Sequence, residues 1–586
     1  MAALADALNR GDAAAAAGLF EPGGYWRDFL ALTWNLTTCE GREQIRAMLA
    51  ATLATARPGA WALQGPAKQA DGTIEAWFGF ETAAGRGTGI LRLRDGRCWT
   101  LLTTLQSLKG FEERCGRNGN REPGVVHGVT RDRQSWLERR EAVAAELGRT
   151  RQPFCLIVGG GQGGLALAAR LGRLNVPALV IDAHARAGDA WRKRYRSLAL
   201  HDPVWYDHLP YLPFPDHWPV FSPKDKIGDW LEMYARVMEI NLWSSTTCLG
   251  ARRDEANDRW DVEVERDGER IMLRPRHLVL ATGLSGLPNM PALPGAEGFE
   301  GTLCHSGDHA GGEAYRGKKC VVLGANNSAH DICADLWEHG AEPVMLQRSP
   351  TVVVRSEMLM EFAWGRLYSE EAVRAGITTE RADLLNASVP LRVMPQLQQP
   401  IYEEIRRRDA ALYEGLDRAG FLYHFGEDGS GIHSTYMRRG AGYYIDVGAT
   451  PMVIDGRIGL RRAGIARLER RAVHLDDGSV LPADLVVCAT GYGPMNQWVE
   501  KLVSPEVAEK VGRCWGVGSD TKGDPGPWEG EPRNMWKPTR QPGLWFQAGN
   551  LMQARHYSIY LALQLKARME GLATPVYGLA PAHHRH

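Results

Sequence analysis

Two glycine-rich turns carry the residue types and the spacing best suited to bind phosphate. The first turn, residues 159–164, follows an apolar run and precedes a helix-favouring segment. Gly159 permits the tight turn, Gly161 lets a pyrophosphate approach the backbone, and Gly164 lets the helix pack closely. Free N–H groups at the helix start favour an anion. The glycines expected at this cofactor are Gly159, Gly161, Gly163 and Gly164.

An acidic residue ends the strand that follows the first turn. The apolar run 178–181 stops at Asp182, 18 residues after Gly164. A carboxylate at this place accepts hydrogen bonds from both ribose hydroxyls, and it repels a 2′-phosphate. The alternative, an ordinary glycine-rich turn, leaves Asp182 unexplained. The pattern therefore predicts a βαβ unit that binds a dinucleotide lacking the 2′-phosphate.

The second turn, residues 324–329, predicts a different nucleotide. The strand after it, 343–346, ends in Gln-Arg-Ser rather than in an acid. Arg348 and Ser349 suit a 2′-phosphate, by a charge-assisted contact and a hydroxyl donor, so this half should prefer NADPH over NADH. The alternative is an arginine on a solvated strand end. The expected cofactor residues are Gly324, Asn326, Asn327, Ser328, Gln347, Arg348 and Ser349.

Two nucleotide folds that end differently imply two cofactors, FAD and NADPH. Two further strands with a Thr-Gly ending, at 277–283 and 484–492, are expected to return to the first sheet, so that the NADPH domain is an insertion. Their cofactor residues are expected to be Thr282, Gly283, Thr490, Gly491 and Tyr492. The fold class is α/β, with two Rossmann-like domains and an N-terminal α+β domain. The predicted regions are an N-terminal domain (1–120), a connector (121–152), a first FAD-domain segment (153–290), an NADPH domain (291–455) with a helical cap (356–425), and a second FAD-domain segment (456–586).

Composition excludes several other classes. The 586 residues include 69 Lys plus Arg and 69 Asp plus Glu, so no net charge gathers nucleic acid. The ten cysteines are never closer than 13 residues, so neither a zinc pair nor a redox CxxC pair exists, and no metal is expected. No signal peptide and no run of 18 apolar residues is found, which predicts a cytoplasmic protein without a membrane partner.

Further motifs resemble the class B flavin monooxygenases, which include flavin-containing, YUCCA-type and Baeyer–Villiger enzymes. The segment 299–309 resembles the family fingerprint, with His309 at its final aromatic position. Gly188 and Trp191 match the family's glycine–tryptophan turn, and 489–492 matches its ATGY strand. Residues 195–224 resemble the YUCCA-type segment. The resemblance covers residues 153–567.

The resemblance implies an NADPH-dependent monooxygenase: NADPH reduces FAD, O2 adds to the flavin C4a, and NADP⁺ shields the peroxyflavin until a small organic substrate arrives. Oxygenation at nitrogen or sulfur, or YUCCA-like decarboxylation of an aryl-pyruvate, is expected, with Baeyer–Villiger oxygenation of a ketone as the alternative. Candidate catalytic residues are Arg348, His201 and Asn550; Asn550 and Gln553 would donate to the flavin carbonyls. His305 and His309 could carry protons or fix the domain crossover.

Residues 1–120 resemble an NTF2-like (SnoaL-like) domain. We expect it to act as a lid over the substrate entrance or as a contact in a homo-oligomer. A rival of another class is a non-catalytic flavoprotein that recruits a partner through this domain. A pyridine-nucleotide disulfide reductase is excluded because it needs a cysteine pair beside the flavin, and no cysteine lies between Cys155 and Cys248.

Overall fold

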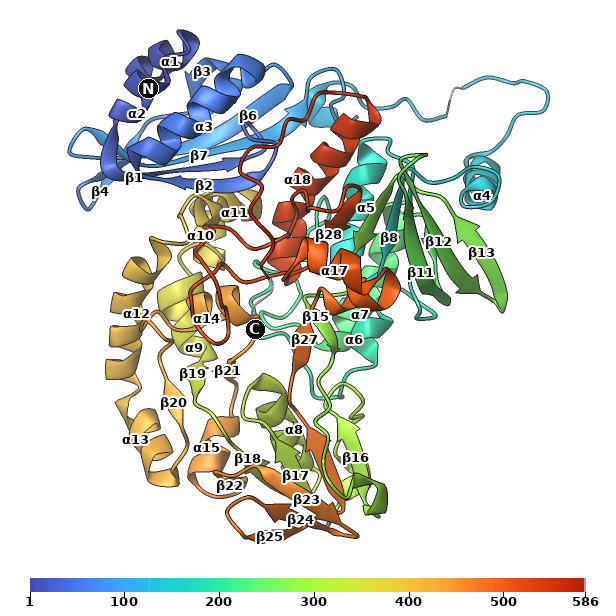
Figure 1. Cartoon of the computed structure of the whole chain (residues 1–586), viewed down its shortest axis with the longest axis vertical. Helices are drawn as coiled ribbons and strands as arrows, with labels where there is room; N and C mark the ends of the chain where they lie inside the picture. The colour runs from blue at the N-terminus through green and yellow to red at the C-terminus, as the bar shows by residue number, and fades with distance from the viewer. Residues whose placement is uncertain (126, 584–586) are drawn as a thin grey trace.

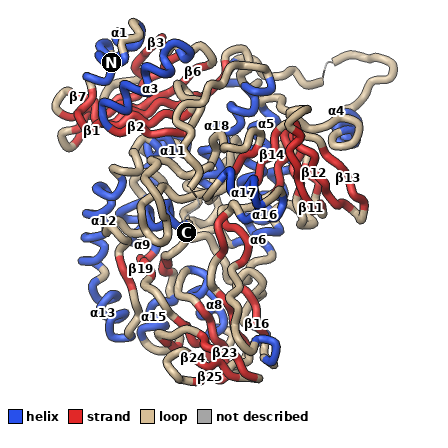
Figure 2. The backbone as a smooth tube through the Cα atoms, viewed as in Figure 1, coloured by secondary structure: helices blue, strands red, loops and turns tan. Residues whose placement is uncertain are grey.

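A computed structural model describes residues 1–125 and 127–583. The N-terminal domain packs beside the first nucleotide-binding domain, and the second nucleotide-binding domain lies at the opposite end of the molecule (Figure 1). Helices of a cap connect the two ends along one side, and long irregular segments run between them (Figure 2). One residue of the predicted connector, position 126, and the last three residues lie outside the described residues. No described helix is long and apolar enough to cross a bilayer.

The N-terminal domain is a curved sheet covered on one face by three helices. Its strands lie in the order β2-β1-β7-β6-β5-β3, with β4 paired to β5. Alternate residues of β5 are buried, as expected where one face of a sheet meets a core and the other meets solvent. The elements are α1 (Ala2–Asn9), α2 (Ala13–Gly18), β1 (Phe20–Phe29), β2 (Leu36–Glu40), α3 (Gly41–Ala56), β3 (Gly59–Leu63), β4 (Lys68–Ala70), β5 (Thr73–Glu81), β6 (Gly85–Arg94) and β7 (Arg97–Leu108).

The first nucleotide-binding sheet is parallel throughout, in the order β10-β9-β8-β14-β28. Every residue of its three inner strands is buried, as is typical of a parallel sheet covered on both faces. Helix α5 connects β8 to β9, and α18 packs against α5. The elements are β8 (Cys155–Val158), α5 (Gln162–Arg173), β9 (Ala178–Ile181), α6 (Asp189–Arg192), α7 (Lys224–Val237), β10 (Leu242–Trp243), β14 (His277–Leu280), β28 (Leu544–Phe546) and α18 (Leu551–Met569).

The second parallel sheet has the order β16-β26-β17-β18-β22 and carries α8. Strand β26 pairs with β16 and β17, so the prediction that segment 484–492 returns to the first sheet is wrong. A four-residue buried apolar run fits either parallel sheet, and only its neighbours decide. The elements are β16 (Thr302–His305), β17 (Lys319–Leu323), α8 (Asn327–Glu338), β18 (Glu342–Leu346), β22 (Gly459–Arg461) and β26 (Leu485–Cys488).

Strand β26 also corrects the predicted boundary between the NADPH domain and the second FAD-domain segment. The second domain runs past residue 456 to the end of β26, and the first sheet is completed by β28 instead. The second sheet nevertheless lies between β14 and β28 in the chain, so it is an insertion in the first domain. The chain enters and leaves the inserted domain through two strands, β15 (Ser285–Pro288) and β27 (Tyr492–Pro494), which pair with each other in antiparallel fashion.

The cap and the remaining elements surround these sheets. The helix-forming segment 356–425 contains α9 to α13, and a small sheet of order β20-β19-β21 anchors it. These elements are β19 (Thr351–Arg355), α9 (Ser356–Leu359), α10 (Glu370–Arg374), α11 (Thr379–Ala387), α12 (Met394–Arg408), α13 (Ala410–Ala419), β20 (Tyr423–His424), α14 (Ile432–Arg439), β21 (Tyr443–Asp446) and α15 (Ala449–Ile454). Outside the cap lie α4 (Trp136–Glu146), β11 (Thr246–Asp254), β12 (Arg259–Arg266), β13 (Glu269–Leu273), β23 (Ile465–Glu469), β24 (Ala472–Leu475), β25 (Val480–Pro482), α16 (Gln497–Leu502) and α17 (Pro505–Val511).

A buried ion pair fastens the N-terminal domain to the rest of the chain. Arg27 on β1 donates to both carboxylate oxygens of Glu531, at 2.6 and 2.7 Å, and to the backbone oxygen of Ala387 at 2.6 Å. Thr38 donates to the same carboxylate at 2.7 Å. Although burial opposes its charge, Glu531 raises the pKa of Arg27. The domain is therefore docked through polar groups that satisfy one another.

We predict that Arg27→Ala destabilises the protein by about 3–5 kcal/mol, because Glu531 then remains charged and buried without its partner. Urea unfolding followed by circular dichroism measures the change. Arg86→Ala is the matched control, since Arg86 pairs with Glu112 on the exposed surface of the same domain. The control should leave the transition almost unchanged. An Arg27→Ala transition that matches the control contradicts the proposed role of the buried pair.

Candidate functional site: two dinucleotide cradles and their hinge

The first glycine turn is shaped for close approach. Gly159 has a φ of +113°, and a Cβ there would lie 2.3 Å from the Ala281 carbonyl oxygen. A Cβ on Gly164 would lie 2.0 Å from the Gly159 carbonyl oxygen, so α5 packs directly on its own turn. At Gly161, the N-cap of α5, nothing lies within 4 Å of the same position. The glycine at the helix entrance thus faces open space of the kind that a pyrophosphate needs.

Asp182 is held in its charged form beside this turn. Its carboxylate accepts hydrogen bonds from the backbone N–H of Gly160 at 2.6 Å and of His184 at 2.7 Å. Burial favours the neutral acid, but the hydrogen bonds from His184 and Gly160 outweigh burial and lower the pKa of Asp182. Oδ1 also accepts a hydrogen bond from His184 Nδ1 at 2.9 Å, so Oδ2 is the oxygen that keeps a second lone pair for a ribose hydroxyl. The acid fits the predicted adenosine end of FAD.

The N-terminus of α18 meets the N-terminus of α5. A Cβ on Gly163 would lie 3.1 Å from the Gln547 carbonyl oxygen, just before α18 begins. Asn550 and Gln553 form a capping box: each side chain accepts a hydrogen bond from the other's backbone N–H. Two positive helix ends therefore point to one region, which suits an anionic cofactor.

The two side chains of the capping box also contact tyrosines. The Asn550 amide donates to the Tyr206 hydroxyl at 3.1 Å, and the Gln553 carbonyl oxygen accepts from Tyr436 at 2.7 Å. The Asn550 contact uses one of its two amide N–H groups, and the Gln553 contact uses its carbonyl oxygen, so donation from these amides to the flavin carbonyls stays a prediction. The positive N-terminus of α18 also suits the ring. Nearby, the Thr282 hydroxyl is buried and has no hydrogen-bond partner among the described residues, as expected of a cofactor ligand.

Gly188 and Trp191 support the first cradle, by which we mean the glycine turn 159–164 and the start of α5. The second cradle is the corresponding turn 324–329 with the start of α8. A Cβ on Gly188 would lie 2.2 Å from the Gly228 carbonyl oxygen, so this glycine permits α6 to touch α7. The Trp191 indole donates to Gln162 at the start of α5, at 3.2 Å. Gly283 has a φ of +97° and ends the turn after β14. Among these residues Trp191 reaches the helix entrance, whereas Gly188 acts on packing.

The second turn repeats the first with different residues. Gly324 has a φ of +136°, and a Cβ there would lie 2.4 Å from the Ala489 carbonyl oxygen. Asn326 is the N-cap of α8, yet its side chain does not cap the helix. Asn327 instead accepts the backbone N–H of Ile445 at 2.9 Å. The backbone N–H groups of Asn327 and Ser328 have no hydrogen-bond partner among the described residues and suit a phosphate, whereas those of Ala329 and His330 donate to the Asn326 carbonyl oxygen.

The three residues that follow β18, which we expected to bind one nucleotide together, differ in exposure. Arg348 and Ser349 are exposed, where a 2′-phosphate could reach them. The Gln347 amide is buried and bonds in both directions to the backbone of Leu422, at 2.8 Å each. The expected role of the Gln347 side chain in cofactor binding is therefore not supported, because its groups already anchor the cap.

The hinge between the two domains contains the predicted residues 490–492. The Thr490 hydroxyl donates to the Asn289 carbonyl oxygen at 2.5 Å. His305 accepts the Gly307 N–H on Nδ1 at 3.1 Å, so its Nε2 donates to the Gly491 carbonyl oxygen at 2.9 Å. Its ring also lies edge-on to Tyr492. His305 therefore fixes the crossover, the structural one of its two expected roles.

His201 and His309 both lie near the second domain. His201 Nε2 lies 3.8 Å from the carboxylate of Asp331 on α8. His309 is buried, its Nε2 lacks a hydrogen-bond partner among the described residues, and burial lowers its pKa. His201 thus spans the two nucleotide domains, and its expected contact with the flavin stays a prediction.

Comparison with known proteins supplies the deciding observation. A family model described as flavin-binding monooxygenase-like matches residues 189–373. The probable indole-3-pyruvate monooxygenase YUCCA3 of Arabidopsis thaliana is 30% identical over 343 residues, which cover 58% of this chain and 72% of that relative. The chain belongs to the flavin-binding monooxygenase family. It is an NADPH-dependent flavin monooxygenase with FAD and NADPH as cofactors, as the sequence predicted.

Other relatives of this flavin monooxygenase agree. The indole-3-pyruvate monooxygenase YUCCA1 of Oryza sativa subsp. japonica is 37% identical over 216 residues, which cover 37% of this chain and 52% of that relative. A structure of OTEMO in complex with FAD and NADP has a TM-score of 0.51 at 16% identity, covering 72% of this chain and 85% of that chain. An open cyclohexanone monooxygenase has a TM-score of 0.50 at 15% identity, with coverage of 72% and 87%. Both structures show the shared fold.

The monooxygenase also contains a pair of acidic residues, half-buried Asp202 and buried Asp207, that sequence reasoning missed. Burial raises the pKa of Asp202 to about 7, and burial together with the charge of Asp202 raises the pKa of Asp207. Neither carboxylate oxygen of Asp207 has a hydrogen-bond partner among the described residues. The segment lies against α18, since Arg555 donates to the Tyr206 carbonyl oxygen at 2.7 Å. The only signal in the sequence was two aspartates flanking aromatic residues.

We predict that Gly161→Val leaves the monooxygenase folded but weakens FAD binding at least about tenfold, because the new side chain occupies the space open to the pyrophosphate. Fluorescence titration of the apoprotein with FAD measures the affinity. Gly172→Ala on α5, where a Cβ also meets nothing within 4 Å, is the control. Equal FAD affinity in both variants would refute the assignment of the first cradle.

We predict that Asp202→Asn removes part of the pH dependence of stability. A carboxyl with an ordinary pKa of 3.8 and a folded pKa of about 7 holds its proton longer in the folded state, so stability falls as pH rises between these values. The variant should flatten that fall, by at most about 4 kcal/mol. Thermal melting across the window measures it. The exposed Asp216→Asn in the same segment should leave the profile unchanged.

Proposed function

We propose that this flavin monooxygenase uses NADPH and O2 to place one oxygen atom on a small organic substrate, at a nitrogen or sulfur atom. The observation that carries the proposal is the pair of cradles, one ending at Asp182 and the other at exposed Arg348, joined by a two-stranded hinge. FAD would be held by the first turn and NADPH by the second. Bound FAD supplies the electron transfer and the reaction with O2.

The chain's own groups would orient the cofactors and control water and protons. The positive N-terminus of α18 favours negative charge on the neighbouring ring. The Tyr206 and Tyr436 hydroxyls bond to the capping box, and burial raises the pKa of both well above the ordinary value. These tyrosines remain neutral donors near neutral pH. The Asp202 and Asp207 pair is the proton-holding group that we assign to this region.

Two other reactions stay open. Oxidative decarboxylation of an aryl-pyruvate is supported by the YUCCA relatives, whose names state indole-3-pyruvate monooxygenase activity. Baeyer–Villiger oxygenation of a ketone is less favoured, because His309 stands at the final fingerprint position without the Trp of those enzymes. A non-catalytic flavoprotein is disfavoured because the glycines and acid of the first cradle are intact. The ten free cysteines support a cytoplasmic location.

For the N-terminal domain we infer an NTF2-like module that acts as part of the substrate entrance. Three helices on one face of a curved mixed sheet support the assignment. Its docking through Arg27 onto Glu531 and the cap favours the lid over the homo-oligomer contact. The oligomer contact remains a prediction that gel filtration of the intact protein tests.

The test of the reaction is to follow NADPH oxidation together with incorporation of isotopically labelled O2. We expect one labelled oxygen atom per NADPH in the product of a sulfide or tertiary amine. An aryl-pyruvate that releases CO2 in the same ratio, with sulfides and amines inert, would replace the proposal by decarboxylation. NADPH oxidation that yields only hydrogen peroxide with every substrate class would contradict both.

We predict that Arg348→Ala raises the KM for NADPH by roughly 10- to 100-fold and the KM for NADH little, because one charge-assisted contact to the 2′-phosphate is lost. Initial rates with each coenzyme measure the two constants. Arg457→Ala is the control, since Arg457 pairs with Asp455 on the surface of the same region. Equal effects of Arg348→Ala on both coenzymes would refute the 2′-phosphate assignment.

A further inference from the structure

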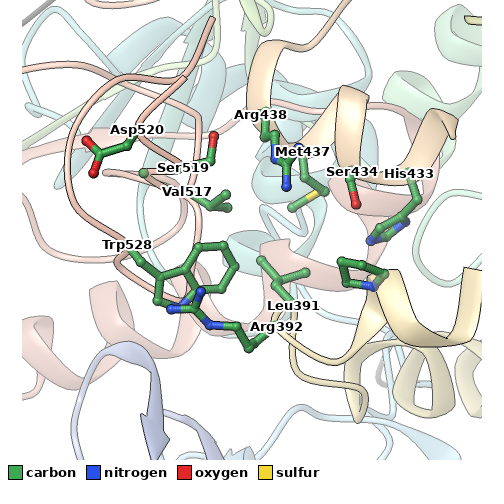
Figure 3. Close-up of a pocket in the computed structure, with 12 residues that line it drawn as sticks. Leu391, Arg392, His433, Ser434, Met437, Arg438, Val517, Ser519, Asp520 and Trp528 are labelled. Atoms are coloured by element: carbon green, nitrogen blue, oxygen red, sulfur yellow. The ribbon is translucent and has the colours of Figure 1, made fainter. Parts of the chain in front are cut away.

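A cavity of about 300 Å³ lies where the cap meets the C-terminal region of the chain. Its walls come from residues 391–395 and α14 of the cap and from the loop 517–528 (Figure 3). This volume matches the lower end of small-molecule pockets in proteins. The side chains that line it include Leu391, Arg392, His433, Met437, Val517 and Trp528.

The floor of the cavity adjoins the predicted flavin region. Met437 lines the cavity, and its Sδ lies 3.9 Å from the amide nitrogen of Gln553 in the α18 capping box. The preceding residue, Tyr436, donates to the same Gln553 at 2.7 Å. Met437 therefore contacts both the cavity and the helix end that we assign to the flavin.

The N-terminal domain holds one wall of the cavity in place. Glu40 on β2 accepts the Trp528 indole N–H at 2.5 Å and the Arg392 guanidinium at 3.2 Å. The Arg392 guanidinium stacks 4.1 Å from the centre of the Trp528 ring, and the two side chains lie side by side in Figure 3. A single carboxylate thus joins the cap segment to the 517–528 loop. The N-terminal domain supplies no lining residue but positions two of them.

The cavity is chemically suited to an uncharged ring. Leu391, Met437, Val517 and the Trp528 ring provide apolar contact. The two cations are already paired, Arg392 with Glu40 and Arg438 with Asp428 at 2.7 Å. A ligand carboxylate would therefore find no unpaired cation among the described lining residues. This distribution disfavours an anion.

One buried polar group remains for a ligand, while the Asp520 carboxylate, which also lines the cavity, is exposed and further disfavours an anion. His433 Nε2 is buried and has no hydrogen-bond partner among the described residues. Burial and the nearby charge of Arg27 lower the pKa of His433 to about 4, so its ring is neutral at neutral pH. The unpartnered Nε2 offers one hydrogen bond, and leaving it unmade is costly. A ligand polar group could complete it.

We propose that this cavity binds the substrate as an uncharged, ring-containing molecule with one group that hydrogen-bonds to His433, and that Glu40 is a positioning residue for the cavity wall. The inference rests on the proposed function, because it treats the occupant as the molecule to be oxygenated. It also gives the N-terminal domain a defined role, which is to hold Trp528 and Arg392 against the ring.

The test compares indole with indole-3-acetate, which share a ring and differ by a carboxylate. Calorimetric titration of the FAD-loaded enzyme should show indole binding at least about tenfold more tightly. His433→Leu should weaken indole binding about tenfold while the flavin content stays constant. Tighter binding of indole-3-acetate, or indole binding unaffected by His433→Leu, overturns the proposal.

The role of Glu40 has its own matched pair of variants. Glu40→Gln should weaken indole binding several-fold, because an amide cannot pair with the Arg392 charge, whereas Glu43→Gln on the exposed face of α3 should not. Identical affinities would overturn the positioning role. Binding is measured without turnover, so it does not depend on the reaction. If indole binding responds to these variants but the enzyme oxygenates no substrate, the proposed function is contradicted and the binding site is not.

Discussion

The close approach of α5 to its own glycine turn is the constraint on which the rest of the monooxygenase depends. No side chain fits at Gly159 or Gly164, where a Cβ would lie 2.3 and 2.0 Å from a backbone oxygen. This contact sets the position of the α5 N-terminus. Helix α18 then packs beside α5, and its capped end points to the same place. Two helix dipoles thus converge on the first nucleotide site, which explains how a chain of zero net charge can bind an anionic cofactor there.

The regions around this centre are connected by buried polar groups rather than by apolar packing alone. Arg555 on α18 holds both the loop at Tyr206 and, through a bidentate pair at 2.8 Å, Asp383 of the cap. Arg27 does the same for the N-terminal domain, the cap and Glu531. Buried pairs of this kind add little net stability but penalise any arrangement that separates the partners. They specify how the domains sit around the cavity at Met437.

Local sequence patterns correctly predicted the regions whose structure depends on neighbouring residues in the chain. The glycine turns, the acid after β9 and the helix-forming cap segment follow from residues close together in the chain. The strand at 485–488 was assigned to the wrong sheet, because its buried apolar residues carry no sign of their neighbours. Gln347 was expected at a nucleotide and instead bonds to Leu422, 75 residues away. The pocket residues at Leu391, His433 and Trp528 had no motif at all.

The sequence by itself determined that two dinucleotide folds are present and predicted a nucleotide for each, because a turn, a helix start and a strand end are set by about 25 consecutive residues. Only the tertiary structure decided what surrounds them. The Asp202 and Asp207 pair owes its proton affinity to burial, and the cavity owes its wall to Glu40, which lies 488 residues from Trp528. Desolvation and long-range contact are properties of the packed chain, and no spacing along the sequence encodes them directly.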